Sequence, residues 1–383
     1  ANAFCEVNEL RISDFNEETI GFQFGPQLNA PGRLQEATIA VQALIAETEE
    51  EARVSIEKMK QMNEERKELV NQAVQEAIQI VAQQPLGSSI VVAKEGWNPG
   101  IVGIVASRLV EEFHRPTIVL GIDREKQIAK GSARSIEHFH LYDTLAEMSD
   151  VIEQFGGHEM AAGMTIALDQ FETFQIRFEE RATQKLTEDD FIPKELVDVP
   201  VTLNEITVEH LEGLEQLRPF GMNFERPVYL IEDVKVQNVR QIGQDKSHLK
   251  FQIVDGNETL DVIGFREGRR ALEMTEDITY SFIGELDVNV WNGNKNPQLI
   301  LRDVRSDDWQ LFDVRGIRKV DRWASTVPEN AHWVAFREET MPVWKPNLAK
   351  TTYVEELDIE KAKNEPLVLI DLPQTKEQLS TLI

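Results

Sequence analysis

The spacing of apolar residues predicts helices in the first part of the chain. Residues 35–82 contain no glycine or proline, and their apolar residues recur three or four positions apart. Thr48 followed by Glu51 has the form of a capping box, which predicts a short helix before residue 48 and a long helix of roughly 30 residues after it. A helix of that length spans about 45 Å, so we expect it to link two domains. Residues 2–20 show no complete helix or strand pattern.

Residues 84–190 alternate strand and helix patterns, as an α/β domain does. The apolar run at 89–93 predicts a buried strand, and Asn98 with Pro99 predicts the N-cap and first turn of a helix that runs to residue 113. A second strand at 116–121 completes a βαβ unit. Within this domain we predict four further elements: a strand at 128–133, a helix at 141–154, a strand at 161–168 and a helix at 171–185.

From residue 228 the apolar period changes to two. Strand runs separated by Gly, Asn and Asp turns occupy 228–310 and predict a closed five-stranded barrel, with an OB-fold as the leading candidate. Trp291-Asn292-Gly293-Asn294 joins the longest pair of runs and is a strong hairpin signal. Residues 311–383 return to mixed patterning, with predicted strands at 333–336 and 366–372 and a helix at 375–382. The whole chain is therefore predicted to be an α/β and β multidomain protein.

Composition and charge narrow the function classes. The 383 residues are 41% hydrophobic and 28% charged, which is typical of water-soluble globular protein. No apolar stretch is long enough to span a membrane and no signal peptide is evident, so we expect a cytoplasmic protein without a membrane partner. A single cysteine, Cys5, excludes an internal disulfide and a multi-cysteine zinc site. The net charge of −27 disfavours nonspecific binding to nucleic acid. Only local clusters, such as those in the net-positive segment 84–135, can attract an anion.

Three clusters have the composition of phosphate-binding sites. Ser132, Arg134 and Ser135 place hydroxyls and a cation at the end of a predicted strand, although a solvated strand end would have the same composition. The second cluster, Gly156-Gly157-His158, offers a backbone that a ligand can approach, or a plain turn. The third, at residues 25–33, predicts a rigid loop that ends in a cation at a helix start, or simply a tight turn. Its candidate residues are Asn29 and Arg33.

The predicted barrel carries cations among aromatic residues, the combination that single-strand binders use to hold phosphates and stack bases. Its candidate DNA-binding residues are Lys250, Phe265, Arg266 and Trp291. Ordinary surface charge and core aromatics would account for the same residues. Catalytic motifs are missing: there is no phosphate loop of the Walker type, no Gly-x-Ser-x-Gly elbow and no zinc-protease helix. The pair His138 and His140 is most simply an exposed turn, and no metal cluster stands out.

Four motifs, taken together and in this order, resemble those of a known family. They are Gly-Phe-x-x-Gly-Pro-x-x-Asn-Ala-x-Gly-Arg at 21–33, Gly-Trp-Asn-Pro-Gly-Ile-Val-Gly-Ile-Val-Ala-Ser-Arg-Leu at 96–109, Gly-Ser-Ala-Arg-Ser at 131–135 and Phe-Gly-Gly-His-x-x-Ala-Ala-Gly at 155–163. The chain resembles the C-terminal portion of RecJ-type single-strand-specific exonucleases of the DHH phosphoesterase superfamily. The resemblance covers roughly residues 20–305.

The resemblance implies a 5′-to-3′ exonuclease that degrades single-stranded DNA in recombination and repair. Its metal-binding DHH domain, which holds Mn²⁺ or Mg²⁺, would lie before Ala1, so we expect this chain to bind no metal and to be inactive alone. The implied domains are the end of the DHH domain with a connector (1–47), a linker helix (48–83), the DHH-associated α/β domain (84–190), a connector (191–227), the OB-fold (228–310) and a small C-terminal α/β domain of uncertain role (311–383).

The resemblance also implies roles for residues at matching positions. Ser132, Arg134 and Ser135 would hold DNA phosphate at the 5′ end. Gly156, Gly157 and His158 would line the cleft that faces the metals, and Asn29 and Arg33 would contact the backbone near the scissile phosphate. Gln27 departs from the pattern, because the family loop usually has arginine there, and this puts the contribution of that segment in doubt.

Two other functions stay open from the sequence. Related DHH phosphodiesterases cleave short oligonucleotides or cyclic dinucleotides with a similar Gly-Gly-His motif, although such substrates do not need the barrel at 228–310. Alternatively, residues 311–383 form a protein-interaction module for a helicase or a single-strand-binding protein.

Overall fold

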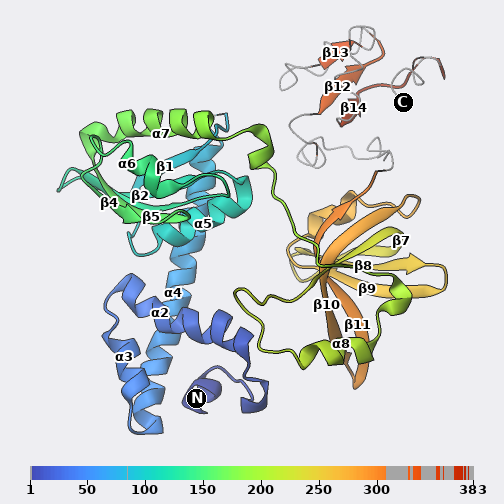
Figure 1. Cartoon of the computed structure of the whole chain (residues 1–383), viewed down its shortest axis with the longest axis horizontal. Coiled ribbons are helices and arrows are strands. Elements are labelled where there is room, and N and C mark those ends of the chain that lie inside the picture. Colours follow the sequence, from blue (N-terminus) through green and yellow to red (C-terminus); the bar gives the residue numbers. More distant parts are fainter. Residues whose placement is uncertain are drawn as a thin grey trace. The chain divides into compact units, whose positions relative to one another are not determined.

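The computed structural model of the chain is shown in Figure 1. The residues it describes are 2–83, 85–307, 327, 331–337, 351–353, 357, 366–373, 375, 376 and 378. The chain divides into two compact units. The first unit consists of Ala1–Glu232, Val254–Ile263 and Ser281–Val304. The second unit consists of Asp233–Ile253, Gly264–Tyr280 and Arg305–Ile383. In the described part of the chain, no helix combines the length and the apolar character needed to cross a bilayer.

The first eighty residues are helical. The helices are α1 (Asn2–Val7), a π-helical turn (Thr19–Phe24), α2 (Gly25–Leu34), α3 (Thr38–Ile45) and α4 (Glu49–Val81). The predicted boundary at residue 48 is confirmed, because Thr48 Oγ1 accepts a 3.3 Å hydrogen bond from the backbone N–H of Glu51. α4 extends from this helical region to the α/β domain (Figure 1), and Phe4, Ala40, Ile56 and Met59 form the core around its first half.

The prediction of a loop at 25–33 is wrong, because these residues form α2. α1 lies within residues 2–20, for which the sequence predicts no complete helix or strand. Pro26 is the second residue of α2 and directly follows the π-helical turn, whose last hydrogen bond runs from the N–H of Gly25 to the carbonyl of Ile20. Pro31 lies in the helix interior, where proline removes a hydrogen bond. Burial of Ala30 and Pro31, together with the packing of Leu28 in the N-terminal core, offsets this cost.

The α/β domain is built on a five-stranded sheet in the order β1-β2-β3-β5-β4. Its elements are β1 (Ile90–Glu95), α5 (Val102–Phe113), β2 (Thr117–Asp123), β3 (Ile128–Arg134), α6 (Leu141–Ala146), β4 (Gln154–Gly157), β5 (Ala161–Ala167) and α7 (Phe171–Lys185). β1 and β2 are parallel, as the predicted βαβ unit requires, and the other neighbours are antiparallel.

Helices cover both faces of this sheet, with α5 and α7 on opposite sides (Figure 1). On one face, α5 and the second half of α4 enclose an apolar core that includes Val70, Val105 and Val119. On the other face, α6 and α7 enclose a core that includes Leu145, Phe174 and Phe178. One face of β3, with Ala129 and Ala133, is therefore buried in the second core, and the other face is only partly covered.

Two predictions within this domain need correction. The helix predicted at 141–154 ends at Ala146, because the backbone N–H of Glu153 already pairs with Thr165 and the chain from Gln154 forms β4. Asn98 is not the N-cap of α5: its Oδ1 accepts a 2.8 Å hydrogen bond from the N–H of Gly100, and the N-cap is Ile101. Asn98 therefore stabilises the turn before the helix.

The predicted barrel is confirmed as a closed five-stranded OB-type sheet. Its strands are β7 (Val228–Ile242), β8 (His248–Asp255), β9 (Glu258–Gly264), β10 (Tyr280–Trp291) and β11 (Asn294–Arg305), preceded by α8 (Val208–Glu215) and the short β6 (Val199–Pro200). The order is β10-β11-β9-β8-β7, and β10 also pairs with β7. The hairpin after β10 turns at Asn292 and Gly293, both with positive φ, as a type I′ turn requires.

The described residues near the C-terminus include a parallel three-stranded sheet. Its strands are β12 (His332–Ala335), β13 (Thr351–Tyr353) and β14 (Leu367–Leu369), in the order β13-β12-β14. β12 and β14 overlap the strands predicted at 333–336 and 366–372. The helix predicted at 375–382 lies mainly outside the described residues.

Candidate nucleic-acid interface

Ser132 and Arg134 lie on the face of β3 that α5 covers. Because side chains alternate along a strand, their neighbour Ala133 belongs to the opposite core. A Cβ atom built on Gly103 would lie 3.1 Å from Nη2 of Arg134 and 3.3 Å from Oγ of Ser132. Both side chains therefore contact the first turn of α5 at a residue that has no side chain of its own. We call Ser132, Arg134 and the first turn of α5 the anion cradle.

The N-terminal end of α5, which forms part of the anion cradle, contains backbone N–H donors. The N-cap, Ile101, provides no side-chain acceptor for the N–H groups of the first turn. Unpaired N–H groups and the positive end of the helix dipole attract anions at such a position. Arg134 donates a 2.7 Å hydrogen bond from Nη1 to the carbonyl of Ala133, which helps to hold its guanidinium. A hydroxyl and a guanidinium thus lie against the first turn of a helix, and such groups can bind a phosphate.

Arg33 approaches the cradle from α2. Its Nη1 donates a 3.4 Å hydrogen bond to the carbonyl of Gly100, in the turn before α5. The backbone carbonyl of Arg33 also packs so tightly on Gly100 that a Cβ atom there would overlap it. This close approach fixes the end of α2 against the start of α5. Asn29 lies one helical turn before Arg33 and is exposed.

The positive charge of Arg33 acts on two other arginines of this region. Burial lowers the pKa of Arg134, and the nearby positive charge of Arg33 lowers it further. Burial also lowers the pKa of Arg66 on α4, and Arg33 is again the largest charged contributor. Among the described residues, none of these three arginines forms an ion pair with a carboxylate. The sequence analysis missed Arg66, because nothing in the pattern of α4 distinguishes it from a solvated arginine.

A shelf without side chains extends from Ser132 across the sheet. Ser132 pairs with Gly163 on β5, and Gly163 pairs with Gly156 on β4. A Cβ atom on Gly156 would meet nothing within 4 Å, so this part of the sheet is open. Gly157 differs: a Cβ atom there would overlap the backbone of the facing strand, so close strand packing requires glycine. His158 follows in the exposed β4–β5 turn, where its Nδ1 accepts from the N–H of Met160.

Two residues of the motifs face away from the cradle. Ser135 is buried, and its hydroxyl donates a 2.5 Å hydrogen bond to the carbonyl of Phe139, which holds the loop after β3. Gln27 is also buried. Its Nε2 donates a 2.7 Å hydrogen bond to Oδ1 of Asn8, so it secures α2 to the chain after α1.

On the barrel, three predicted residues gather around His248. The ring of Phe265, 56% exposed, contacts the ring of His248 edge to face at 5.6 Å. The backbone N–H of Arg266 donates a 2.9 Å hydrogen bond to Nδ1 of His248. Lys250 follows two residues after His248, on the same face of β8. An exposed aromatic ring beside cations can stack a base and hold its phosphate.

Trp291 lies at the tip of the β10–β11 hairpin. Its side chain is 72% exposed, and the turn residue Asn292 follows it directly. Water therefore surrounds most of this large apolar ring.

A resident metal would need a cluster of donor side chains. In the described ranges, no group of three or more His, Cys, Asp or Glu residues is placed to hold a metal ion. His140 accepts a hydrogen bond at Nδ1 from the N–H of Asp143 and caps α6. The described residues therefore do not fit a metal centre.

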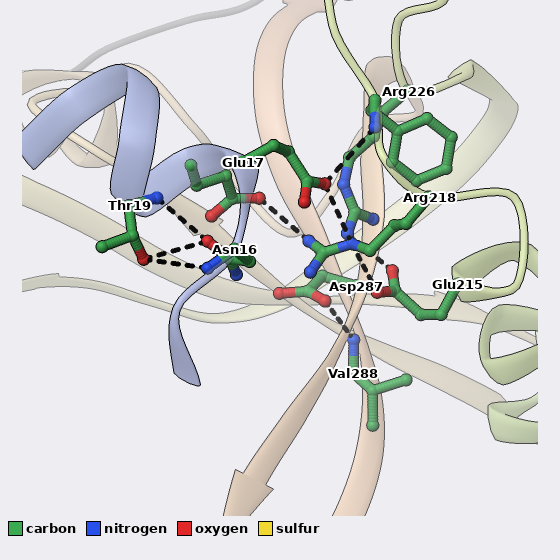
Figure 2. A network of polar contacts seen from close by, with 10 residues as sticks. Asn16, Glu17, Thr19, Glu215, Arg218, Arg226, Asp287 and Val288 are labelled. Carbon is green, nitrogen blue, oxygen red and sulfur yellow. Dashed lines mark hydrogen bonds and ion pairs between the residues drawn. The ribbon is translucent and has the colours of Figure 1, made fainter. Parts of the chain in front are cut away.

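The connector after the α/β domain is bound to the N-terminal helical region by ion pairs (Figure 2). Nε of Arg218 lies 3.3 Å from Oε1 of Glu17 and 2.8 Å from Oε2 of Glu215, and Nη2 of Arg226 lies 2.6 Å from Oε1 of Glu215. Backbone hydrogen bonds lower the pKa of Glu17, and the charge of Arg218 lowers it further. These contacts hold the connector that leads into the barrel.

The α/β sheet with its anion cradle and the OB-type barrel define a class of nucleic-acid-handling protein. Residues 87–184 match the model of the DHHA1 domain, residues 197–303 match the RecJ OB domain, and residues 310–383 match the C-terminal domain of single-strand DNA-specific exonucleases. The chain belongs to the RecJ family.

Individual relatives agree with this assignment. The chain is 41% identical to the single-stranded-DNA-specific exonuclease RecJ of Bacillus subtilis (strain 168), over 97% of this chain and 48% of that protein. It is 31% identical to RecJ of Escherichia coli (strain K12), over 79% of this chain and 54% of that protein. The chain thus spans about half the length of the curated relatives it matches. The fold resembles that of RecJ from Thermus thermophilus in complex with Mn²⁺, with a TM-score of 0.68 and 20% identity over 100% of this chain and 59% of that one.

Proposed function

We propose that this chain is the DNA-binding and substrate-clamping part of a 5′-to-3′ single-stranded-DNA exonuclease that acts in recombination and repair. The observation that carries the proposal is the anion cradle, because a hydroxyl and a guanidinium lie against the first turn of a helix at Gly103. A terminal phosphate offers three oxygens and the charge that such donors bind. The names of the relatives support a single-stranded DNA substrate.

Each part of the interface has a proposed role. Ser132 and Arg134 hold the 5′-phosphate, and Arg33 adds positive charge beside it. The shelf at Gly156 and Gly163 lets the strand approach the sheet backbone, with Gly157, His158 and Asn29 along its path. The barrel stacks and guides the rest of the strand, with Lys250, Phe265, Arg266 and Trp291 as its contacts. Because the hydroxyl of Ser135 is bonded within its own loop, we assign it to the support of the cradle.

The chemistry of strand cleavage is proposed for the whole enzyme. Solved RecJ structures contain Mn²⁺ or Mg²⁺, and we propose the same divalent metals for the enzyme to which this chain belongs. The residues described here bind and orient the strand. We place this activity in the cytoplasm, where the one cysteine, buried and unpaired, suits a reducing compartment. A helicase or single-strand-binding protein as a partner of residues 311–383 stays a prediction, to be tested by pull-down with and without those residues.

Fluorescence anisotropy tests the proposal with the chain as it is. A single-stranded oligonucleotide carrying a 5′-phosphate is compared with the same strand carrying a 5′-hydroxyl, and with duplex. We expect tighter binding of the phosphorylated single strand, and we expect Arg134→Gln to abolish the difference. Arg124→Gln is the matched control, because Arg124 is exposed in the same domain and pairs with Glu95 at 2.7 Å.

Two results would contradict the proposal. If the chain binds 5′-phosphate and 5′-hydroxyl strands equally at low salt, the cradle does not hold the terminal phosphate. If cyclic dinucleotides or very short oligonucleotides compete as well as long strands, the alternative of a small-nucleotide phosphodiesterase is favoured, since the barrel then contributes nothing.

A further inference from the structure

Two polar groups on one turn of α4 lack partners. Nε of Arg66 is buried and has no hydrogen bond to any residue that the structure describes. One helical turn earlier, Asn63 is only 3% exposed, and its Oδ1 is likewise without a partner among the described residues. Buried polar groups are nearly always hydrogen-bonded, because a buried group without a partner destabilises the folded state. Such a pair of groups indicates a ligand.

The packing of α4 shows where Arg66 lies. Val70, one turn after Arg66, packs in the same core as Val102 of α5, and Leu34 of α2 packs against that core. Arg66 therefore lies where α4 meets the end of α2 and the start of α5. These are the two elements that bring Arg33 to the anion cradle.

The local charges are mainly positive. Beyond the effect of burial, the charge of Arg33 lowers the pKa of Arg66, the carboxylate of Glu64 raises it, and the charge of Arg108 lowers it. Arg33 also acts on Arg134. The positive charge of Arg33 thus acts on both Arg66 and Arg134. Without an anion, this arrangement costs electrostatic energy.

We propose that Arg66 forms a second phosphate subsite, next to the anion cradle, which binds an internal phosphodiester of the single strand. Asn63 is its positioning residue, because its buried amide lies one helical turn before the guanidinium. This proposal rests on the proposed function, because the cradle defines which phosphate is the terminal one. A nucleotide with a single phosphate fills the cradle alone, whereas a longer strand fills both subsites.

The difference between one phosphate and several provides the test. Binding of thymidine 5′-monophosphate and of a 5′-phosphorylated oligothymidylate is measured for the unmodified chain, Arg66→Gln and Arg134→Gln. We expect Arg66→Gln to weaken oligonucleotide binding by about tenfold at low salt, and to reduce the log–log salt slope by about 0.7, the value for one phosphate contact on a single strand. Binding of the mononucleotide should stay unchanged. Arg134→Gln should weaken both ligands.

Lys67→Gln is the matched control. Lys67 is adjacent on α4, is exposed and pairs with Glu64 at 2.8 Å, so its loss should leave the salt slope unchanged. Arg66→Lys keeps the charge and should restore most of the slope, which a residue that only stabilised the fold through its Nε–H would not do. It also provides a second variant if the glutamine variant does not fold.

The outcomes separate this inference from the proposed function. If Arg66→Gln lowers the thermal midpoint while the oligonucleotide affinity and slope match the unmodified chain, Arg66 is structural and the second subsite is refuted. If Arg66→Gln weakens the mononucleotide as much as the oligonucleotide, Arg66 belongs to the cradle itself and the proposal is again wrong. If the unmodified chain does not bind the oligonucleotide, the proposed function fails first.

Discussion

The indole Nε1 of Trp97 donates a 2.8 Å hydrogen bond to Oε2 of Glu76. Nζ of Lys94 lies 3.0 Å from the other carboxylate oxygen. Trp97 precedes the turn that leads into α5, and Glu76 lies on α4, so this contact joins the long helix to the approach of the anion cradle. The hydrogen bond from Trp97, followed by those from Lys94 and Gln72, lowers the pKa of Glu76 to about 2.

This contact makes stability depend on pH. The pKa of Glu76 is lower in the folded chain than its ordinary value of 4.5, so its full contribution is present above pH 4.5 and is lost as the pH falls toward 2. Glu76→Gln should lower the free energy of unfolding at neutral pH by about 1 kcal/mol, since the carboxylate is partly exposed. Urea denaturation across that pH range checks this. Glu68→Gln on the same helix is the control, and equal pH profiles for both variants would contradict the prediction.

Gly103→Ala should fill the anion cradle. The new Cβ atom would lie 3.1 to 3.4 Å from the side chains of Arg134 and Ser132, and these flexible groups can move aside. We expect the fold to persist and the preference for a 5′-phosphate to fall about fivefold or more, roughly 1 kcal/mol or one hydrogen bond. Anisotropy with 5′-phosphorylated and 5′-hydroxyl strands measures this. Gly213→Ala in α8, where a Cβ atom meets nothing within 4 Å, should leave the preference unchanged.

Gly100→Ala should act on stability as well as on binding. Its Cβ atom would overlap the backbone carbonyl of Arg33, and backbone cannot move aside as a side-chain end can. The end of α2 must shift, at a cost of about 1–3 kcal/mol for overpacking, and Arg33 loses its place beside the cradle. Thermal unfolding and anisotropy together check this prediction. An unchanged thermal midpoint would show that α2 is held less tightly than the contact indicates.

Trp291→Ala should weaken binding of single strands without lowering stability. The ring is 72% exposed, so its removal leaves no cavity, while a base stacked on it contributes about 1–3 kcal/mol. Val290→Ala is the control, because Val290 is the preceding residue and is also exposed but cannot stack a base. Anisotropy and thermal unfolding of both variants distinguish the two effects. Equal loss of affinity in both would indicate a general effect on the hairpin.

Most of the elements follow from local sequence patterns. The βαβ unit, the cap at Thr48, the barrel strands and the turn at Asn292-Gly293 were predicted correctly, because each depends on residues close together in the sequence. The errors occurred where distant contacts decide the backbone. α2 is a helix despite Pro31 because it packs in the N-terminal core. The helix from Leu141 ends at Ala146 because residues 154–157 pair with β5 and form β4.

The sequence by itself determined the order of the domains and the motif that contains Ser132 and Arg134. Only the tertiary structure decided which side chains share one site. It turned Ser135 toward Phe139 and Gln27 toward Asn8, and it placed Gly103 against Ser132 and Arg134. The physical reason is that alternation along a strand or helix assigns a residue to a face. Packing between segments far apart in the chain then decides which other element lies against that face. It therefore also decides whether a buried arginine has a partner.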